Sequence, residues 1–368
     1  MRRLAIVAVA VLALSGCNVR YGWGADVPVR GSNATAPTDV GSGKAWRTVD
    51  AGMERSCAIG ADRRLVCEAF DGEEEVHGPA LEPQWTAVAT GYEHTCAIWG
   101  AGDLYCWGSN ASGALGTGDD TTAYRSAPQR VSTASDWRTV AAGEHGTCAI
   151  RGAGELWCWG GGSIVGGVVG DGTTASRTTP TRIGTASDWT TVSVEARHSC
   201  GVRGGGELWC WSSDGRSGDG TGQIRLSPVR IGSASNWRTV SVSPYHSCGL
   251  RGGDLWCWGQ NDYGEVGDGT TTARLAPVRI GGTSDWTTIS AGGTDRPGGS
   301  GGGGEYFSAH TCGIRRPGTL WCWGLNAKGE LGDGTTATRI APTRVGTASD
   351  WTAVSSGGSS TDGVRAEA

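Results

Sequence analysis

With 368 residues, the chain is long enough for one large domain or two ordinary ones. Its 65 glycines and 18 tryptophans, beside only two phenylalanines and two methionines, are untypical of an enzyme and typical of short strands joined by tight turns. The formal charge of −5, without any run of lysine or arginine, argues against a nucleic-acid partner, because such a partner requires a basic surface.

The N-terminal segment has the features of a secretory signal. Arg2 and Arg3 precede an apolar run, Leu4–Leu14, that is too short to span a bilayer. The sequence Leu14-Ser-Gly-Cys17 resembles the bacterial lipobox, whose cysteine is lipidated and becomes the mature N-terminus. We expect residues 1–16 to be a lipoprotein signal peptide and Cys17 to carry the lipid. An ordinary secretory signal and an uncleaved anchor are the alternatives.

Thirteen cysteines are present, and the twelve other than Cys17 form pairs at a nearly constant spacing. The pairs are Cys57 and Cys67, Cys96 and Cys106, Cys148 and Cys158, Cys200 and Cys210, Cys248 and Cys257, and Cys312 and Cys322. An even set of cysteines in an exported chain predicts disulfides. Zinc is the alternative, but structural zinc sites prefer closer Cys-x-x-Cys spacing, which is absent.

A pattern of the form Trp-x-Thr/Ala-Val/Ile recurs along the chain and marks an internal repeat. It begins at Trp46, Trp85, Trp137, Trp189, Trp237, Trp286 and Trp351. A full repeat continues with a strand around the first cysteine, a strand around the second cysteine, a Gly-Asp-Gly turn and a Pro-x-Arg-Val/Ile strand. A period near fifty residues with four short strands per unit describes one blade of a β-propeller.

The paired cysteines fit an antiparallel hairpin. If Cys96 faces Cys106, then Ile98 faces Leu104, and Gly100-Ala-Gly102 forms the turn. The copy between Cys248 and Cys257 is one residue shorter, and the deletion falls in its turn, Gly252-Gly253, so the strand register survives. Directly opposed residues of such a hairpin can form a disulfide. Both faces of the hairpin are apolar, which predicts that neighbouring blades cover them.

Several motifs follow the second cysteine in register. Trp107-Gly-Ser-Asn110 and its copies at Trp258 and Trp323 are each followed by Gly-x-Leu/Val-Gly. These features resemble the regulator-of-chromosome-condensation (RCC) repeat over residues 44–358. The resemblance implies a β-propeller, usually of seven blades.

We therefore expect an all-β fold, a propeller of four-stranded blades. It would have six cysteine-pinned blades plus a terminal strand, Trp351–Val354, that either closes the ring or begins a seventh blade. The first unit is degenerate, because Cys67-Glu-Ala-Phe replaces Cys-Trp-Gly-x-Asn. Residues 17–43 are expected to form a lipidated tether, residues 44–358 the propeller and residues 359–368 a polar tail.

Members of the RCC family include a nucleotide-exchange factor for a nuclear GTPase and a plant protein whose tryptophan clusters absorb ultraviolet light. The first activity conflicts with the expected export, and the blade motif itself explains the tryptophans here. The resemblance thus predicts a binding platform whose specificity lies in its loops.

Two recurring residue types are candidate ligands of a metal. His94, His198, His246 and His310 each precede the first cysteine of a hairpin by two residues, and Asp171, Asp219, Asp268 and Asp333 each begin an Asp-Gly-Thr turn. We expect no metal at either set. The histidines are expected to bond a neighbouring backbone group, and a single carboxylate per turn is too few for calcium. No catalytic motif is present, although a Ser-His-Asp arrangement remains open.

One irregular insertion, Gly292–Ala309, separates the first and second strands of its blade. It is either a flexible glycine linker or a binding loop, and Tyr306 and Phe307 are its candidate contact residues.

The most consistent interpretation is a non-catalytic binding module without a cofactor, exported and lipid-anchored to the bacterial cell envelope. In a Gram-negative host the anchor would lie in the outer membrane. The partner would be a protein or a polysaccharide, with no nucleic acid, with membrane contact through the lipid anchor only, and with the module monomeric. The alternatives are a hydrolase or lyase working on a propeller face, or a guanine-nucleotide exchange factor.

Overall fold

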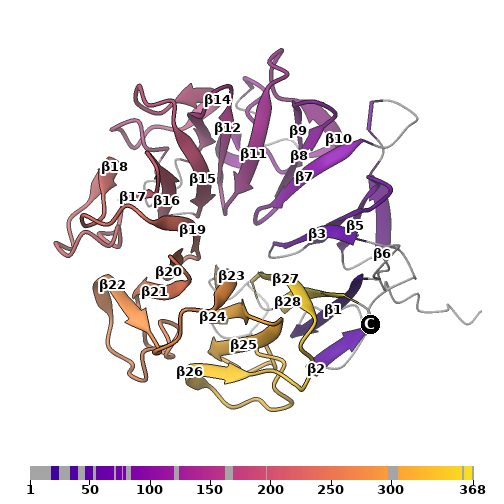
Figure 1. Ribbon diagram of the computed structural model, residues 1–368. Helices are drawn as coiled ribbons and strands as arrows, with labels where there is room; N and C mark the ends of the chain where they lie inside the picture. Colours follow the sequence, from indigo (N-terminus) through magenta and orange to yellow (C-terminus); the bar gives the residue numbers. More distant parts are fainter. Residues whose placement is uncertain are drawn as a thin grey trace, which may run out of the picture.

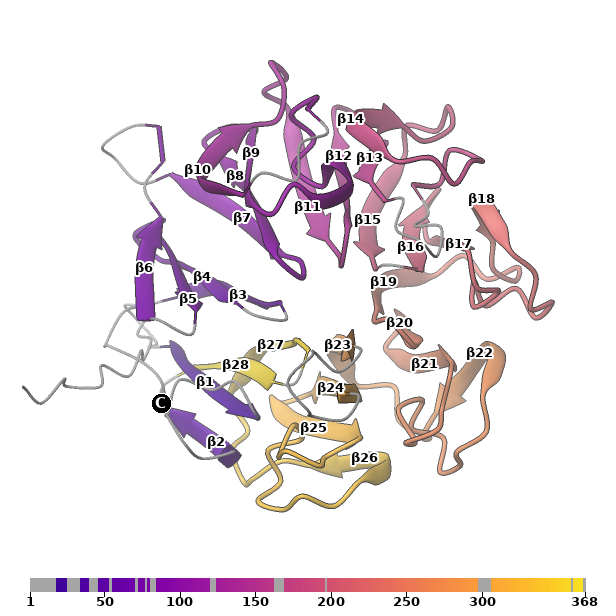
Figure 2. The same cartoon turned by 180° about the vertical axis from the view of Figure 1, so that it is seen from behind.

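Short antiparallel sheets arranged as a ring make up the molecule (Figures 1 and 2). The computed structural model describes residues 18–24, 34–39, 46–52, 55–69, 72–76, 78–79, 84–119, 124–161, 169–195, 197–296, 306–358 and 360–366. Within these residues the only helical element is the 3₁₀ turn η1 (Ala111–Gly113). Each sheet contributes its first strand to the centre of the ring.

Six sheets are made of consecutive strands. Blade 1 consists of β3 (Trp46–Ala51), β4 (Ser56–Gly60), β5 (Leu65–Ala69) and β6 (Gly72–Val76). Blade 2 consists of β7 (Trp85–Thr90), β8 (His94–Trp99), β9 (Asp103–Gly108) and β10 (Arg125–Arg130). Blade 3 consists of β11 (Trp137–Ala142), β12 (Gly146–Arg151), β13 (Glu155–Gly160) and β14 (Arg177–Arg182).

The next three blades repeat this order. Blade 4 consists of β15 (Trp189–Val194), β16 (His198–Arg203), β17 (Glu207–Ser212) and β18 (Arg225–Arg230). Blade 5 consists of β19 (Trp237–Val242), β20 (His246–Arg251), β21 (Asp254–Gly259) and β22 (Arg274–Ile280). Blade 6 consists of β23 (Trp286–Arg296), β24 (Tyr306–Arg315), β25 (Thr319–Gly324) and β26 (Arg339–Arg344).

The two ends of the chain build blade 7 together. β27 (Trp351–Ser356) pairs with β28 (Ser360–Ala366), which pairs with β1 (Asn18–Gly24), and β2 (Ala34–Asp39) forms the outer edge. The terminal tryptophan strand therefore begins a seventh four-stranded sheet, one of the two outcomes that the sequence left open. In the described part of the chain the ring has seven sheets, and six of them carry a disulfide.

This arrangement corrects two predicted boundaries. Residues 18–24 and 34–39 lie in the predicted tether, and residues 360–366 lie in the predicted polar tail, yet all three segments are strands of blade 7. These strands were not predicted because their sequences are largely polar. Thr361 and Val364 are buried in β28, although the segment looks like a tail in sequence. Cys17 lies outside the described residues.

The predicted hairpin register is confirmed. Cys96 faces Cys106, Ile98 faces Leu104, and the shorter copy pairs Arg251 with Asp254 across its two-glycine turn. Each disulfide joins two directly opposed residues in the middle of its blade.

All six predicted cysteine pairs form disulfides, with Cα–Cα distances of 4.1 Å. In blades 1 to 6 in turn, Cys57 is bonded to Cys67, Cys96 to Cys106, Cys148 to Cys158, Cys200 to Cys210, Cys248 to Cys257, and Cys312 to Cys322. Because all twelve sulfurs are shared within their own hairpins, these cysteines have no capacity left for the alternative of a zinc site.

Adjacent blades share their hydrophobic cores. The disulfide face of blade 3, with Ile150 and Leu156, packs against Trp189 and Trp211 of blade 4 in a single buried cluster. Five further interfaces repeat this contact between a cystine and tryptophan of the next blade, with Trp351 alone on the blade 7 side of its interface with blade 6. Blade 7 has no disulfide among its described residues, and it packs Val364 against Trp46 and Val66 of blade 1 instead. One blade therefore buries its aliphatic face only when the following blade is in place.

Two recurring residues fit this architecture, a glycine between adjacent blades and a proline at the outer edge of the sheets. Gly116 ends the Gly-x-Leu-Gly motif with φ +70°, and a Cβ there would lie 2.6 Å from the indole nitrogen of Trp159 in the next blade. A proline stands within the outermost strand of six blades, at Pro37, Pro128, Pro180, Pro228, Pro277 and Pro342. A proline at the edge of a sheet discourages pairing with another strand.

Side chains near the axis join most neighbouring first strands. The Oγ atoms of Ser193, Ser241, Ser290 and Ser355, and a carboxylate oxygen of Asp50, each accept a hydrogen bond from the first strand of the next blade, at 2.6–3.1 Å. The same position in blades 2 and 3 is occupied by Ala89 and Ala141. An alanine side chain offers no acceptor, so these two positions cannot form the bond.

Removing one disulfide is expected to destabilise the ring moderately. Replacing both Cys96 and Cys106 with alanine should lower the free energy of unfolding by about 2–3 kcal/mol, because the unfolded chain regains the entropy of the closed loop. Urea unfolding of the oxidised proteins measures the difference. A loss below about 1 kcal/mol would show that the hairpin is held by its hydrogen bonds and packing alone.

Candidate functional site

The ring has two chemically different faces. In every blade the first and third strands run toward one side, which carries the connections between third and fourth strands, and these are long in blades 2 to 6. We call this side the loop face. The opposite side carries the hairpin turns between second and third strands and the short connections between blades, and we call it the turn face.

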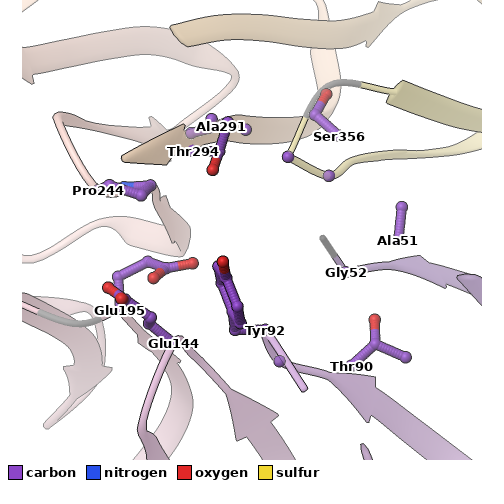
Figure 3. A pocket seen from close by; sticks show the side chains of 15 residues that line it. Ala51, Gly52, Thr90, Tyr92, Glu144, Glu195, Pro244, Ala291, Thr294 and Ser356 are labelled. Atoms are coloured by element: carbon purple, nitrogen blue, oxygen red, sulfur yellow. The ribbon is translucent and has the colours of Figure 1, made fainter. Parts of the chain in front are cut away.

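A cavity lies on the axis at the loop face (Figure 3). The ends of the first strands and the residues after them line it, and its largest side chains are those of Tyr92, Glu144, Glu195 and Pro244. Its volume is about 60 Å³. Pockets for drug-sized ligands measure about 300–1,000 Å³, so this one has room for a few water molecules or the tip of one side chain.

The insertion in blade 6 stands beside this cavity. β23 and β24 are long strands that stay paired as far as Arg296 and Tyr306, so much of the insertion is an extended hairpin. Tyr306 and Phe307, expected on a flexible loop, lie in β24 near the free end of this hairpin. The hydroxyl of Tyr245 in blade 5 donates to the carbonyl of Thr294 at 3.2 Å and supports the hairpin from the side.

The recurring histidines join one blade to the next. Each Nε2 contacts a hydroxyl in the following blade at 2.6–2.9 Å, in the pairs His94–Thr147, His198–Ser247, His246–Thr311 and His310–Thr361. A bond to a neighbouring backbone group was expected, and the partner is instead a side chain of another blade. No group of three or more potential metal ligands occurs among the described residues.

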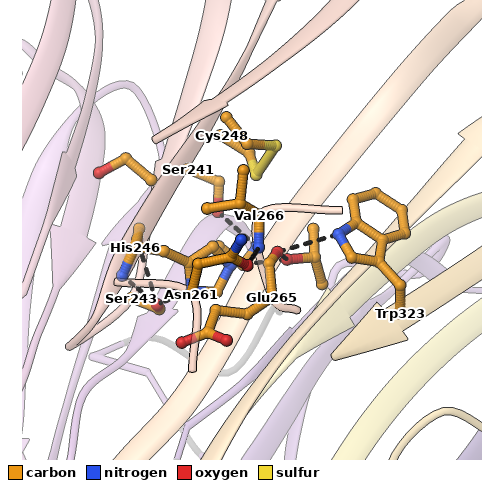
Figure 4. Close-up of a disulfide and its surroundings, with 12 residues drawn as sticks. Ser241, Ser243, His246, Cys248, Asn261, Glu265, Val266 and Trp323 are labelled. Carbon is orange, nitrogen blue, oxygen red and sulfur yellow. Dashed lines mark hydrogen bonds between the residues drawn. A yellow bond between two sulfur atoms is a disulfide. The ribbon is translucent and has the colours of Figure 1, made fainter. Parts of the chain in front are cut away.

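The surroundings of His246 show how the bonds are directed (Figure 4). The hydroxyl of Thr311 donates to the carbonyl of Glu265 at 2.9 Å, so it accepts from Nε2 of His246. The opposite ring nitrogen, Nδ1, then accepts from the hydroxyl of Ser243 at 2.8 Å. Trp323 donates to the same carbonyl of Glu265 at 2.9 Å.

Burial keeps these histidines neutral. It lowers the pKa of His94 and His310 to about 4 and that of His246 to about 3, with a further lowering at His246 from the neighbouring histidines. Burial also lowers the pKa of His198. Their role is to hold adjacent blades together, and they do not serve as exposed ligands or proton carriers.

The Asp-Gly-Thr turns use their carboxylates internally. Oδ1 of Asp171 accepts from the backbone nitrogen and the hydroxyl of Thr173, and Oδ2 accepts from Nε of Arg177 at 2.8 Å. Asp219, Asp268 and Asp333 repeat the arrangement with Arg225, Arg274 and Arg339. Burial works to raise the pKa of each carboxyl, but the hydrogen bonds and the arginine together lower it. These aspartates therefore fasten the loop to the outer strand.

Serine, histidine and aspartate do come together around blade 4, but not as a catalytic relay. Nε2 of His198 contacts Ser247, while its Nδ1 has no hydrogen-bond partner among the described residues, and Asp214 pairs with Arg216 at 3.3 Å. His198 and Ser247 are fully buried, so no substrate reaches them. The arrangement that would support an enzyme is therefore not formed at this place.

The turn face carries an excess of arginine that sequence reasoning missed. The carboxylates of its described turns pair with arginines, and they are those of Asp62, Asp103, Asp136, Glu155, Asp188, Glu207, Asp254, Asp285 and Asp350. Further arginines remain on this face beyond those pairs. In the sequence, arginine recurs at the second position of the Trp-x-Thr strand. That these arginines share one face becomes evident only when the direction of each strand in the ring is known.

Three of these additional arginines are Arg47, Arg138 and Arg238, in the first strands of blades 1, 3 and 5. All three are exposed, and no hydrogen bond or ion pair joins their guanidinium groups to described residues. The other four blades have threonine at this position, and each hydroxyl donates to a carbonyl of the second strand at 3.0–3.2 Å. The threonines are satisfied within their blades, whereas the arginines face solvent.

Other arginines of this face stack on tryptophan. The guanidinium of Arg251 lies 3.9 Å from the ring centre of Trp256 and 5.8 Å from that of Trp237. Blades 3, 4 and 6 have equivalent stacks on Trp157, Trp209 and Trp321. The arginines of these three stacks, Arg151, Arg203 and Arg315, also pair with carboxylates. The turn face thus presents half-buried indoles covered by guanidinium groups.

The repeat is recognised by two models of known families. The model described as the regulator of chromosome condensation (RCC1) repeat matches residues 101–150, 252–294 and 317–361, and a second RCC1-repeat model matches residues 85–114 and 237–265. The chain therefore contains repeats of the RCC1 family. The matched segments lie in blades 2, 3, 5, 6 and 7, in register with the tryptophan strands described above.

One curated protein resembles part of the sequence, and several solved structures resemble the whole fold. The Ultraviolet-B receptor UVR8 of Arabidopsis thaliana is 32% identical over 136 residues, which are 35% of this chain and 30% of the receptor, so the match spans less than a third of that relative. Prp20p of Saccharomyces cerevisiae superposes with a TM-score of 0.79 at 16% identity, covering 100% of this chain and 97% of Prp20p. Human WBSCR16 gives 0.79 at 17% identity, covering 95% and 98%.

No helix among the described residues of this RCC1-repeat propeller has the length and apolarity needed to cross a membrane.

Proposed function

We propose that this chain is an exported, lipid-anchored propeller that binds a protein partner through its loop face. The observation that carries the proposal is the extended β23–β24 hairpin beside the axial cavity, held in place by Tyr245. The cavity is too small for a drug-sized ligand, so an extended surface is the better explanation for a projecting hairpin.

The chemistry of the loop face fits a protein partner. Glu144 and Glu195 line the axial cavity beside the ring of Tyr92, so a partner that presents a basic side chain has a complementary place to insert it (Figure 3). Prp20p, which has a similar fold, binds Gsp1p and histones, which are proteins. A propeller of this kind therefore serves protein binding elsewhere.

The export part of the proposal depends on the N-terminal sequence and the disulfides. Six buried cystines suit an oxidising compartment, and Leu14-Ser-Gly-Cys17 suits lipidation. A Cys17→Ala variant should fail to incorporate radiolabelled palmitate, while the unchanged chain incorporates it. Equal incorporation would contradict lipidation at Cys17.

A crosslinked pull-down from the host's own membranes tests partner binding. A Tyr306→Ala/Phe307→Ala double variant is expected to lose the partner, because aromatic residues commonly supply most of the energy of a protein interface. Tyr124→Ala is the matched control, since Tyr124 is an exposed aromatic residue that precedes the outer strand of blade 2. Loss in both variants, or in neither, would contradict a site on the hairpin.

A further inference from the structure

The start of β1 places the proposed anchor on one face of the ring. Asn18 pairs with Ala366, the last residue of β28, and Gly24 pairs with Ser360. β28 is a second strand and therefore ends at the turn face, so Asn18 lies at the turn face as well. Cys17 is the residue before Asn18. A lipid on Cys17 would thus be attached directly at the turn face, without the tether expected from the sequence.

The described side chains of the same face carry an excess of positive charge. Its described carboxylates are already paired with arginine, and Arg47, Arg138 and Arg238 are exposed without partners among the described residues. Arginines therefore outnumber carboxylates among the described side chains of this face.

We propose that the turn face rests on an anionic lipid surface, with Arg47, Arg138 and Arg238 contacting lipid headgroups. This inference is built on the proposed lipid anchor, because the anchor brings that face to the bilayer. It adds a second membrane contact to the lipid itself. A lipid chain and a basic patch are a known combination for stable attachment, since each is weak alone.

Two further properties of the face agree with this placement. Short connections and hairpin turns form it, whereas the long loops and the β23–β24 hairpin are on the opposite side. Half-buried tryptophans such as Trp157 and Trp256 lie under stacked arginines there, and tryptophan and arginine are favoured at the interface between lipid and water. The loop face would then point away from the membrane, toward its partner.

The test uses the chain without its lipid, so that failure of lipidation does not affect it. A protein beginning at Asn18 retains every described strand and is therefore a complete ring. It should cosediment with phosphatidylcholine vesicles that contain phosphatidylglycerol, not with phosphatidylcholine alone, and about 0.5 M salt should release it.

A triple variant, Arg47→Gln/Arg138→Gln/Arg238→Gln, should bind the anionic vesicles about 100-fold more weakly, because each basic residue near an anionic surface contributes about fivefold. The control is Arg55→Gln/Arg197→Gln/Lys328→Gln, which removes the same charge from the loop face and should retain binding. Melting curves confirm that both variants fold.

Three results would overturn the proposal: no binding to anionic vesicles, equal binding to neutral ones, or an equal loss in the two triple variants. If the arginine variant instead loses a captured protein while vesicles are not bound, the turn face recognises an acidic protein. The pull-down with the Tyr306/Phe307 variant remains an independent test of the loop face.

Discussion

Lowering the pH from about 6.5 to about 4 is expected to destabilise the propeller by about 1.4 kcal/mol per pH unit for each buried histidine. For His94, His246 and His310 together the slope is about 4 kcal/mol per pH unit near pH 5. The unfolded chain binds a proton at each histidine near pH 6.5. The folded chain does not do so until about pH 4, or about pH 3 at His246.

The sign follows from this difference. Between these pH values the unfolded state holds more protons, so acid favours it, and the contribution of the histidines is complete only above about pH 6.5. Burial raises the pKa of Asp50 and Glu265, and these two groups oppose the trend. Carboxyls with a lowered pKa, such as Asp333, also lose their contribution to stability in acid. They do so only around and below the usual carboxyl pKa, so they add little to the slope between the two histidine pKa values.

Urea unfolding at several pH values between about 4 and 7 measures the slope. A His310→Gln variant should show a slope smaller by about one proton, because Thr361 then faces a group that does not titrate. His145→Gln is the control, since His145 is partly exposed beside Glu144. Identical slopes for the unchanged chain and His310→Gln would contradict a neutral, buried His310.

Deleting Ser360–Ala368 is expected to destabilise the protein by about 5 kcal/mol or more. Burial of Val364 alone is worth about 2 kcal/mol, and His310 is left buried without its partner Thr361 at a further cost of about 1–3 kcal/mol. β1 and β2 also lose the strand that joins them to the ring.

The melting temperature and the rate of trypsin cleavage measure this loss. Deleting only Glu367 and Ala368 serves as the control and should change neither, because β28 ends at Ala366. Val364→Ala should have an intermediate effect. If the longer deletion melts like the control, blade 7 does not stabilise the ring.

The repeat made most of the fold predictable. Direct opposition of Cys96 and Cys106 set the hairpin register, and a one-residue deletion within the Gly252-Gly253 turn supported it. Blade 7 was harder to predict, because its strands lie at opposite ends of the chain. β28 also has none of the cysteine and tryptophan signals of the second strand in other blades.

The candidate site was less predictable than the fold. Spacing identified the histidines as a set, but Thr147 lies 53 residues from its partner His94, and only the ring places them together. The sequence shows Arg47, Arg138 and Arg238 at the same position of the repeat. Their exposure and their common face are properties of the closed ring, which no local pattern contains.

Blade 7 also determines the order in which the ring can fold. Asn18 of β1 pairs with Ala366 of β28. The ring therefore cannot close until β28 has formed. A growing chain can complete blades 1 to 6 one after another, yet β27 and β1 lack their shared partner until β28 has been made. Closure of the ring is therefore a single late step. A chain that lacks β28 would expose unpaired edges of β27 and β1, and exposed strand edges promote aggregation.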